Sequence, residues 1–413
     1  MSAVHLHIGQ CGNQLSVPLW QNFIRSSSKG TEQLFTSLDG YHRSVHIDSE
    51  RKVIASLPEK FRIREKNVVI GKRGRGTNFA LGYNGMTSAG DDHILDSAME
   101  AVRKEVERCD VYSGIIVYHS ISGGTGSGLG AHMIEMLRDN YPCNYIISCA
   151  VAPCVSGESP LQNYNALLAL HWLQTFSDCI ILLQNDVYLS QLHSNLYSDE
   201  TVKQISFRDL NGVIANNLCG VFLPTSTLSL SRNVSIGQEP WELVRTLTPM
   251  PSTKFINLSQ YISSKLSWDE MTSKVLSFYP KFNAEGVQNH CLSGTCVARG
   301  DTNNIFLSAV NKGIDKKVKK GVNVVTWNPY PFDWWRSAVN TVGTKKNCSL
   351  TLATNSTCVL DHLNIVHAKS QVKLESGAYL HWYERYGISQ DMFSESMETL
   401  LSVVSAYEDI RKS

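Results

Sequence analysis

The stretch from Gly114 to Asp139 constrains the fold of this chain more than any other segment. It contains an unbroken apolar run, Ile115–Tyr118, typical of a strand buried on both faces of a parallel sheet. A glycine-rich segment, Ser120–Gly128, follows, and then helical periodicity with three apolar residues on one face: Met133, Ile134 and Leu137. Glycines let backbone N–H groups approach a ligand, and a helix N-terminus attracts negative charge. This order of elements therefore predicts a phosphate-binding turn.

The glycine-rich turn fits neither of two common phosphate motifs. A Walker loop ends in Gly-Lys-Ser or Gly-Lys-Thr, and Ser120–Gly128 contains no lysine. The dinucleotide fingerprint belongs to the first strand–helix turn of a βαβ unit, whereas this turn lies far from the N-terminus. A plain tight turn without a ligand stays open as the alternative. If a phosphate binds, we expect these residues to contact it: Ser120, Gly123, Gly124, Thr125 and Gly126.

The N-terminus has a second segment of the same kind. Val4–Ile8 alternates as a short strand, and Gly9–Gln14 forms a glycine turn before an apolar, helix-like segment. A strand, a glycine turn and a helix are the opening of a nucleotide-binding α/β sheet. In that arrangement the side chains of Gln10 and Cys11 can reach a bound phosphate or base.

Two carboxylates follow the next predicted strand. Ser44–Ile47 has strand character, and Asp48 and Glu50 come directly after it. Ligands of open sheets bind beyond the carboxyl ends of strands, and carboxylates near a phosphate usually hold Mg²⁺. A solvated acidic turn is the alternative, and the local sequence alone slightly favours it.

A basic glycine loop, Gly71–Tyr83, comes next. Its cations Lys72, Arg73 and Arg75 could attract phosphate, although exposed arginines are more often simply solvated. From Asp91 to Arg108 apolar residues recur at helical spacing, which predicts a helix covering the sheet.

A base-binding arrangement is suggested by three polar or aromatic residues. The predicted strand Cys179–Gln184 ends at Asn185, whose amide can both donate and accept hydrogen bonds at a purine edge. A long helix is expected from about Ile205, with Phe207 and Asn211 one turn apart on the same face. Two amides and an aromatic ring suit guanine. Without a nucleotide, Phe207 would be interpreted as a core residue.

The second half of the chain predicts another α/β domain. Three strand-like segments, Phe255–Leu258, Cys296–Arg299 and Val322–Trp327, alternate with helical stretches. The basic run Asn311–Lys320 suggests a solvated face. Trp327–Trp335 suggests a packed surface loop, and two helical segments are expected from Ile365 onwards.

Four of these stretches, in this order, resemble the tubulin family. They are Gly9–Gln14, Gly76–Ala80, Gly123–Gly128 and the Tyr379–Tyr383 stretch, Tyr-Leu-His-Trp-Tyr. The resemblance extends from Val4 to about Tyr407. It implies an α/β fold of the tubulin type, with a Rossmann-like parallel-sheet GTPase domain, a central helix, a second α/β domain and C-terminal helices. The implied boundaries are 1–203, 204–224, 225–360 and 361–413.

The resemblance also implies residue roles around GTP and Mg²⁺. Gly76 and Thr77 would close over the γ-phosphate, and Glu158 would contact the ribose. Asn185, Phe207 and Asn211 would bind guanine, and Asp48 and Glu50 would hold Mg²⁺.

The family's catalytic carboxylate, which orients water towards the nucleotide of a neighbouring subunit, aligns best with Glu242. Glu239 is a less favoured choice. Only one carboxylate is needed to orient the water, since the rest of the chemistry is positioning and electrostatics. Glu242 follows Pro240 at a predicted helix start, so stabilisation of the helix dipole explains it equally well without catalysis.

Within the family, three stretches are most similar to the delta branch, with the zeta branch as neighbour: Arg103–Asp110, Gln162–Asn165 and Lys203–Asn211. The segment after Tyr407 lacks the acidic tail of alpha and beta members. These features imply a specialised subunit of centriole or basal-body microtubules, active in cilium assembly. Expected partners are other tubulins, through lateral or longitudinal contacts, and centriolar proteins. Expected locations are the cytoplasm, cytoskeleton, centrosome and cilium basal body, with the nucleus as an open alternative.

Composition excludes several other classes. A net charge of +1 gives no bulk attraction to nucleic acid or membrane surfaces, so neither is expected as a partner. No apolar run is long enough to span a bilayer, and no signal-peptide pattern precedes the first strand. The closest cysteines, Cys291 and Cys296, fit no common zinc spacing, so the eleven cysteines are expected to be reduced, cytosolic thiols.

Three classes of function remain. The first is a GTP-binding structural subunit that hydrolyses slowly or only when another subunit docks. The second is a self-sufficient GTPase, or a non-polymerising GTP-binding regulator; a self-sufficient GTPase needs a complete water-orienting set in one chain, which the sequence does not provide. The third is a nicotinamide oxidoreductase, and Gly9–Gly12 is not its fingerprint.

Overall fold

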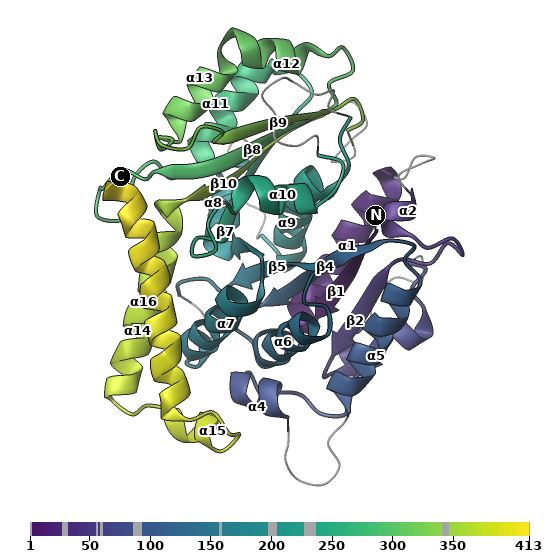
Figure 1. The fold of residues 1–413 in the computed structure, drawn as a ribbon, viewed down its shortest axis with the longest axis vertical. Helices are drawn as coiled ribbons and strands as arrows, with labels where there is room; N and C mark the ends of the chain where they lie inside the picture. Colours follow the sequence, from purple (N-terminus) through teal and green to yellow (C-terminus); the bar gives the residue numbers. More distant parts are fainter. Residues whose placement is uncertain are drawn as a thin grey trace. The chain divides into compact units, whose positions relative to one another are not determined.

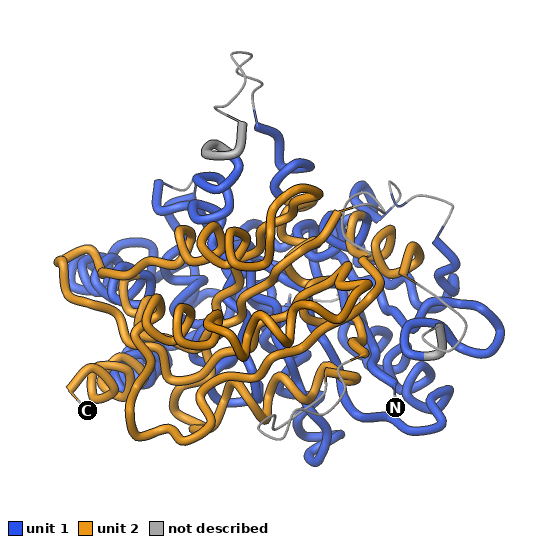
Figure 2. Tube along the Cα trace, turned by 90° about the horizontal axis from the view of Figure 1, so that it is seen from above, with its two compact units in different colours: residues 1–17, 32–210, 362–402 blue, residues 18–31, 211–361, 403–413 orange. Residues whose placement is uncertain are grey.

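A computed structural model describes residues 2–26, 32–54, 57, 61–85, 93–156, 159–196, 205–226, 237–340 and 347–412. The chain divides into two compact units, coloured separately in Figure 2. The first unit comprises Met1–Val17, Glu32–Leu210 and His362–Ser402, and the second Pro18–Thr31, Asn211–Asp361 and Val403–Ser413. Of the helices described, none is long and apolar enough to cross a membrane.

The first unit contains a parallel sheet in the order β3-β2-β1-β4-β5-β6. Each neighbouring pair runs parallel. The central strands are mostly apolar and buried along most of their length, as the apolar runs predict. The strands are β1 (Ser2–Ile8), β2 (Ser44–Asp48), β3 (Val68–Ile70), β4 (Tyr112–Ser120), β5 (Tyr145–Ala152) and β6 (Cys179–Gln184).

Helices α5, α6 and α7 lie side by side across this sheet (Figure 1). The predicted apolar face of α6 is confirmed, because Met133, Ile134 and Leu137 are buried. The helices up to α8 are α1 (Gly9–Ser26), α2 (Glu32–Phe35), α3 (Arg51–Ile54), η1 (Glu65–Asn67), α4 (Phe79–Asn84), α5 (Ile94–Glu107), η2 (Thr125–Leu129), α6 (Gly130–Asn140), α7 (Gln162–Phe176) and α8 (Asn185–Leu196).

The second unit is a mixed α/β structure. Its strands follow the order β7-β10-β8-β9, with β10 antiparallel to β7 and β8 and with β9 parallel to β8. Its core includes Met271, Val275, Phe306 and Trp334. Its elements are α10 (Trp241–Leu247), β7 (Phe255–Ser263), α11 (Trp268–Phe278), β8 (Cys291–Arg299), α12 (Ile305–Ala309), η3 (Val310–Ile314), α13 (Asp315–Gly321), β9 (Phe332–Ser337), β10 (Cys348–Ser356) and η4 (Thr357–Val359).

Four helices belong to both units. The division falls within α1, α9 (Phe207–Phe222), α14 (Leu360–Glu375) and α16 (Gln390–Lys412). The predicted pair of C-terminal helices is present, and the segment between them contains a further short helix, α15 (Leu380–Glu384).

Some sequence expectations for the fold are wrong. Val322–Trp327 is not a strand, because Asn323 has a left-handed φ of 54° and only Val324 forms a bridge, to Cys291. Trp327–Trp335 is not wholly a surface loop: Trp327 is 46% exposed, but Trp334 and Trp335 are buried in β9. Helices α2 and α8 have no counterpart among the predicted elements.

Buried aromatic rings form a layer across three neighbouring strands of the first unit. The His7 ring stacks on His46 of β2 and on Tyr118 of β4, each at a centroid distance of 4.7 Å. His5 stacks on Tyr118 and pairs with its hydroxyl at 3.0 Å. His7 Nδ1 pairs with the Gly12 carbonyl at 3.1 Å, which joins the layer to the turn after β1. Burial lowers the pKa of His5 and His46 to about 3, and that of His7 well below its usual value.

We expect acid to destabilise the protein from about pH 6.5 downwards. Unfolded histidines take up protons near pH 6.5, but the buried rings do not, so each contributes a slope of about 1.4 kcal/mol per pH unit. His42, whose pKa burial lowers to about 4, adds to this slope. Asp48 opposes this slope between about pH 6 and 3.8. Burial raises its pKa to about 6, so in this range the folded protein takes up a proton at Asp48 more readily than the unfolded chain does. One carboxyl does not offset several rings.

Denaturant unfolding at pH 8, 7, 6 and 5 measures this slope. His7→Leu removes one buried ring and should therefore reduce the slope by about 1.4 kcal/mol per pH unit. An identical slope in the variant would contradict the assignment.

Candidate functional site

The turns after the six strands of the first unit lie at one edge of its sheet, because the strands are parallel. The order of the strands along this sheet reverses between β1 and β4, which pair directly with each other. Ligands of open α/β sheets bind at such a reversal, beyond the carboxyl ends of the strands. All predicted nucleotide residues of this unit with described positions come from turns at this edge or from the N-terminus of α9.

The turns after β1 and β4 meet at the reversal. Gly9 has a left-handed φ of 72°, and a Cβ placed there would lie 3.0 Å from the Gly126 nitrogen. A Cβ on Gly12 would lie 2.2 Å from the Tyr118 carbonyl oxygen. Helix α1 begins at Gly9 itself, so the turn after β1 is the first turn of this helix. Glycine at both positions thus allows the first turn of α1 to lie against the end of β4.

The glycine-rich turn also packs backbone to backbone against α4. A Cβ on Gly82 would lie 2.1 Å from the Gly124 oxygen, and one on Gly128 would lie 2.1 Å from the Phe79 oxygen. At Gly124 a Cβ would meet the Arg75 oxygen at 2.6 Å. Packing therefore explains these three glycines.

Gly123 is different, because no atom of the described residues around it lies within 4 Å of where its Cβ would be. Its carbonyl accepts a hydrogen bond from the Ser127 hydroxyl. It stands directly before η2 and α6, whose first N–H groups have no partner within the helix and carry the positive end of its dipole. Open space beside such donors suits an anion.

The hydroxyl groups of the turn are already engaged. Ser120 pairs with the Ser122 hydroxyl at 2.9 Å, and Thr125 pairs with the Ser49 hydroxyl at 2.7 Å. The second contact joins the β4 turn to the acidic turn after β2. Contact of Thr125 with a phosphate would therefore come first from its backbone N–H.

Asp48 is almost fully buried, and its Oδ2 has no hydrogen-bond partner among the described residues. Burial raises its pKa to about 6, so its environment lacks a compensating cation. Glu50 is exposed, and its Oε1 lies against Gly74 of the basic loop, where a Cβ would be 2.4 Å away. No cluster of three or more His, Cys, Asp or Glu suited to a metal occurs in the described part of the chain. The pair fits Mg²⁺ that takes its remaining ligands from water and phosphate.

On the base side, Asn185 at the end of β6 has a buried Oδ1 without a hydrogen-bond partner in the described structure. Phe207 is 69% exposed, so it is not a core residue, and Asn211 is partly buried one turn later on α9. The side chain of Gln10 is exposed. Cys11 is partly buried, and burial raises the pKa of its thiol to about 12, so the thiol is neutral.

The basic loop differs from a freely solvated one. Arg75 is buried, contrary to the expectation of solvation, and its carbonyl oxygen lies close to Gly124. Gly76 and Thr77 are exposed and both have a left-handed φ of 54°. Glu158 lies outside the described residues.

Comparisons with known proteins point the same way. A family model described as the Tubulin/FtsZ family, GTPase domain, matches residues 2–192. The tubulin delta chain of Homo sapiens is 28% identical over 98% of this chain and 99% of its own length. Residues 2–192 belong to the Tubulin/FtsZ family of GTPase domains. The chain is likewise 28% identical to the tubulin delta chain of Mus musculus, over 98% and 99% of the two chains, and 26% identical to the tubulin beta chain of Porphyra purpurea, over 98% and 92%.

One buried residue that the sequence did not single out holds several parts of this tubulin-family site together. Asn165 of α7 is fully buried and bonds to the loop before α4, to the β4 turn and to Tyr383 of α15. A weak hint was available, since Asn165 directly precedes the apolar run Ala166–Leu170. Its partners are distant in sequence and could not be assigned.

Glu242 lies in the first turn of α10, in the second unit. Its carboxylate accepts backbone hydrogen bonds from Gly237, Gln238 and Glu239 at 3.0, 2.8 and 3.1 Å. These contacts support the helix-terminus interpretation. The catalytic role in a tubulin filament stays a prediction.

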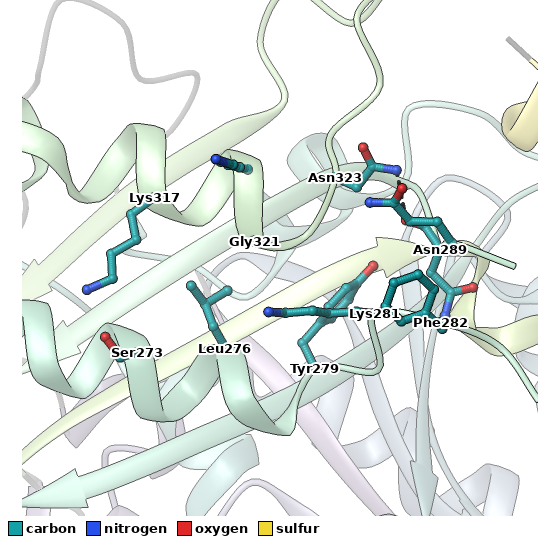
Figure 3. Close-up of a pocket in the computed structure, with 11 residues that line it drawn as sticks. Ser273, Leu276, Tyr279, Lys281, Phe282, Asn289, Lys317, Gly321 and Asn323 are labelled. Carbon is teal, nitrogen blue, oxygen red and sulfur yellow. Dashed lines mark hydrogen bonds between the residues drawn. The ribbon is translucent and has the colours of Figure 1, made fainter. Parts of the chain in front are cut away.

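A cavity of about 400 Å³ lies elsewhere, within the second unit (Figure 3). The residues that line it include Leu276, Tyr279, Lys281, Lys317 and Lys320. Lys317 is paired with Asp269 at 2.7 Å. None of the predicted nucleotide residues lines it, and the tubulin-family site at the strand ends is the better candidate.

We expect Gly82→Ala and Gly123→Ala to separate packing from binding. The first places a Cβ into the Gly124 oxygen and should destabilise the fold by roughly 1–3 kcal/mol, as overpacking does. The second meets open space and should leave the melting temperature unchanged while weakening nucleotide binding. Thermal unfolding and a nucleotide titration measure both. Equal loss of stability in the two variants would contradict this division of the glycines.

Proposed function

We propose that this chain is a GTP-binding structural subunit of the microtubule cytoskeleton. The observation that carries the proposal is the pair of glycine turns meeting at the strand reversal, beside open space at Gly123. Among folds with this strand order, that place is where a phosphate group binds. The match to a GTPase family model supports guanosine triphosphate as the nucleotide.

Guanine selection would rest on Asn185 and Asn211, with Phe207 stacking on the base. Two observations on the described residues support these roles: Asn185 Oδ1 has no hydrogen-bond partner among them, and they leave the Phe207 ring largely exposed. Glu158 would contact the ribose. Gln10 and Cys11, with a neutral thiol, would line the phosphate and base region.

Mg²⁺ would be held by Asp48, directly or through water, with Glu50 as the outer carboxylate. The bound ion would neutralise phosphate charge. The buried, unpartnered Oδ2 of Asp48 supports this, since a cation would compensate the cost of its burial.

The proposed setting is the centriole or basal body, with other tubulins and centriolar proteins as partners, and a role in cilium assembly. Similarity to tubulin delta chains over almost the whole length supports this placement. Imaging a tagged chain in ciliated cells, together with a pulldown of tubulins, tests it; a uniform distribution along all microtubules would argue against a specialised subunit. A non-polymerising GTP-binding regulator is the second candidate.

We expect the purified protein to carry guanine nucleotide or to be loadable with it. Chromatography of the nucleotide released on denaturation, followed by a GTP titration with and without Mg²⁺, measures this. Asp48→Asn should weaken binding in the presence of Mg²⁺ several-fold and have little effect in EDTA. Asp110→Asn, an exposed carboxylate of the same unit, is the control. Folded protein that binds no guanine nucleotide would remove the proposal.

Glu242→Gln tests whether hydrolysis is completed at a subunit interface. Glutamine keeps a carbonyl oxygen that can accept the Gln238 and Glu239 N–H bonds but lacks the charge needed to orient water. We expect unchanged GTP binding and at least tenfold slower assembly-stimulated hydrolysis, measured as phosphate release, with Glu239→Gln as control. Unchanged turnover would leave Glu242 with its helix-terminus role alone.

A further inference from the structure

Asn165 uses every hydrogen-bonding position of its side chain. Its Nδ2 donates to the Thr77 carbonyl and to the Ser122 carbonyl, both at 2.8 Å. Its Oδ1 accepts from the Phe79 N–H at 2.9 Å and from the Tyr383 hydroxyl at 2.7 Å. An amide can make two donor and two acceptor bonds of this kind, so the residue is saturated. One buried side chain thus joins the loop before α4, the turn after β4 and the C-terminal helix α15.

The bond to Thr77 holds a backbone conformation that the residue itself disfavours. A β-branched residue with a left-handed φ of 54° is an outlier that persists only where its surroundings impose it. Gly76 before it shares this φ, and Asn78 after it caps α4 by accepting from the Ala80 and Leu81 N–H groups. Asn165 holds the carbonyl of Thr77, the residue between Gly76 and Asn78, and therefore fixes the direction of the loop.

The C-terminal region makes further contacts with the loop before α4, with the end of α4 and with the turn after β5. The Asn78 amide donates to the Trp382 carbonyl at 3.1 Å, and Asn84 at the end of α4 donates to the Tyr386 carbonyl at 2.7 Å. On α14, Lys369 donates to the Val155 carbonyl at 2.9 Å, within the turn after β5.

The Tyr383 ring itself is fully buried, and it packs edge-on against Tyr164 at 5.5 Å and against Phe393 at 5.3 Å. Its hydroxyl also lies 3.4 Å from the Leu161 carbonyl. Because the ring is held on two sides by aromatic contacts, its hydroxyl is kept within hydrogen-bond distance of Asn165 Oδ1, while backbone groups set the orientation of the amide. Flipping that amide would put donor against donor at Phe79 and acceptor against acceptor at Thr77.

We propose that Asn165, held in place by Tyr383, is a positioning residue for nucleotide binding. It sets the spacing of the Thr77 loop and the Ser122 turn, and through it the C-terminal helices contribute to GTP affinity. This inference rests on the proposed function. It assigns part of the nucleotide affinity to residues that do not touch the nucleotide. A loop that closes over the γ-phosphate should respond more strongly for GTP than for GDP.

The simpler alternative is that Asn165 is only a satisfied polar group of the core. Loss of a buried hydrogen bond would then lower stability and reduce GTP and GDP affinities by the same factor. The ratio of the two affinities separates the explanations, because global destabilisation does not discriminate between two nucleotides.

Tyr383→Phe is the main variant, since it removes the hydroxyl and keeps the aromatic packing. Its matched control is Tyr164→Phe, which makes the same chemical change in the adjoining buried ring, whose hydroxyl has no hydrogen-bond partner among the described residues. Asn165→Ala is the stronger perturbation and is interpreted only if it folds. Binding of GTP and GDP to the full-length protein is measured by titration, and GTP release by stopped flow.

We expect Tyr383→Phe to weaken GTP binding roughly 3- to 10-fold, the range set by one buried hydrogen bond, and GDP binding less than twofold. Tyr164→Phe should match the wild type. Equal factors for GTP and GDP, or no change in either, would overturn the inference while leaving the proposed function intact. A wild-type protein that binds no guanine nucleotide would instead overturn the proposed function and the inference with it.

Discussion

Close approach of three backbone segments is the constraint on which the first unit depends. Helix α4, the turn after β4 and the first turn of α1 lie so near one another that a single methyl group at Gly82, Gly128 or Gly12 would fall within about 2.2 Å of a carbonyl oxygen. Glycines in this region therefore serve packing first. Their packing leaves the N-terminus of η2 and α6 facing open space at Gly123, and this makes the strand edge suitable for an anion.

Neighbouring buried residues hold these three segments in close contact. Below them, the histidine layer ties β1, β2 and β4 together and reaches the Gly12 carbonyl. Beside them, Asn165 fixes two loops and is itself fixed by Tyr383. Two groups predicted to meet a nucleotide, in contrast, have no hydrogen-bond partner within the described part of the chain: Asp48 Oδ2 and Asn185 Oδ1. Rigid support with unsatisfied groups at the edge is the arrangement expected of a binding site.

Local patterns predicted the first unit well, because its strands are apolar runs that a parallel sheet buries on both faces. The strand Cys179–Gln184 and the apolar face of α6 agree with the sequence expectation. Local sequence patterns gave wrong predictions where contacts between distant residues determine the structure. Val322–Trp327 has strand composition but contains a left-handed Asn323, and the tryptophans at 334 and 335 are buried because β9 pairs with β8. For the site, the sequence grouped residues through their turns but could not find Asn165, whose partners lie far along the chain. The roles of the individual nucleotide residues stay predictions.

The most direct test of the central claim is a structure of the full-length protein with Mg²⁺ and a non-hydrolysable GTP analogue, determined by crystallography or cryo-electron microscopy. We predict the phosphates within hydrogen-bond distance of the backbone nitrogens of Gly123–Gly126, with guanine at Asn185. Phosphates located elsewhere, for example among Lys281, Lys317 and Lys320 of the second unit, or a strand edge left empty at saturating analogue, would contradict it.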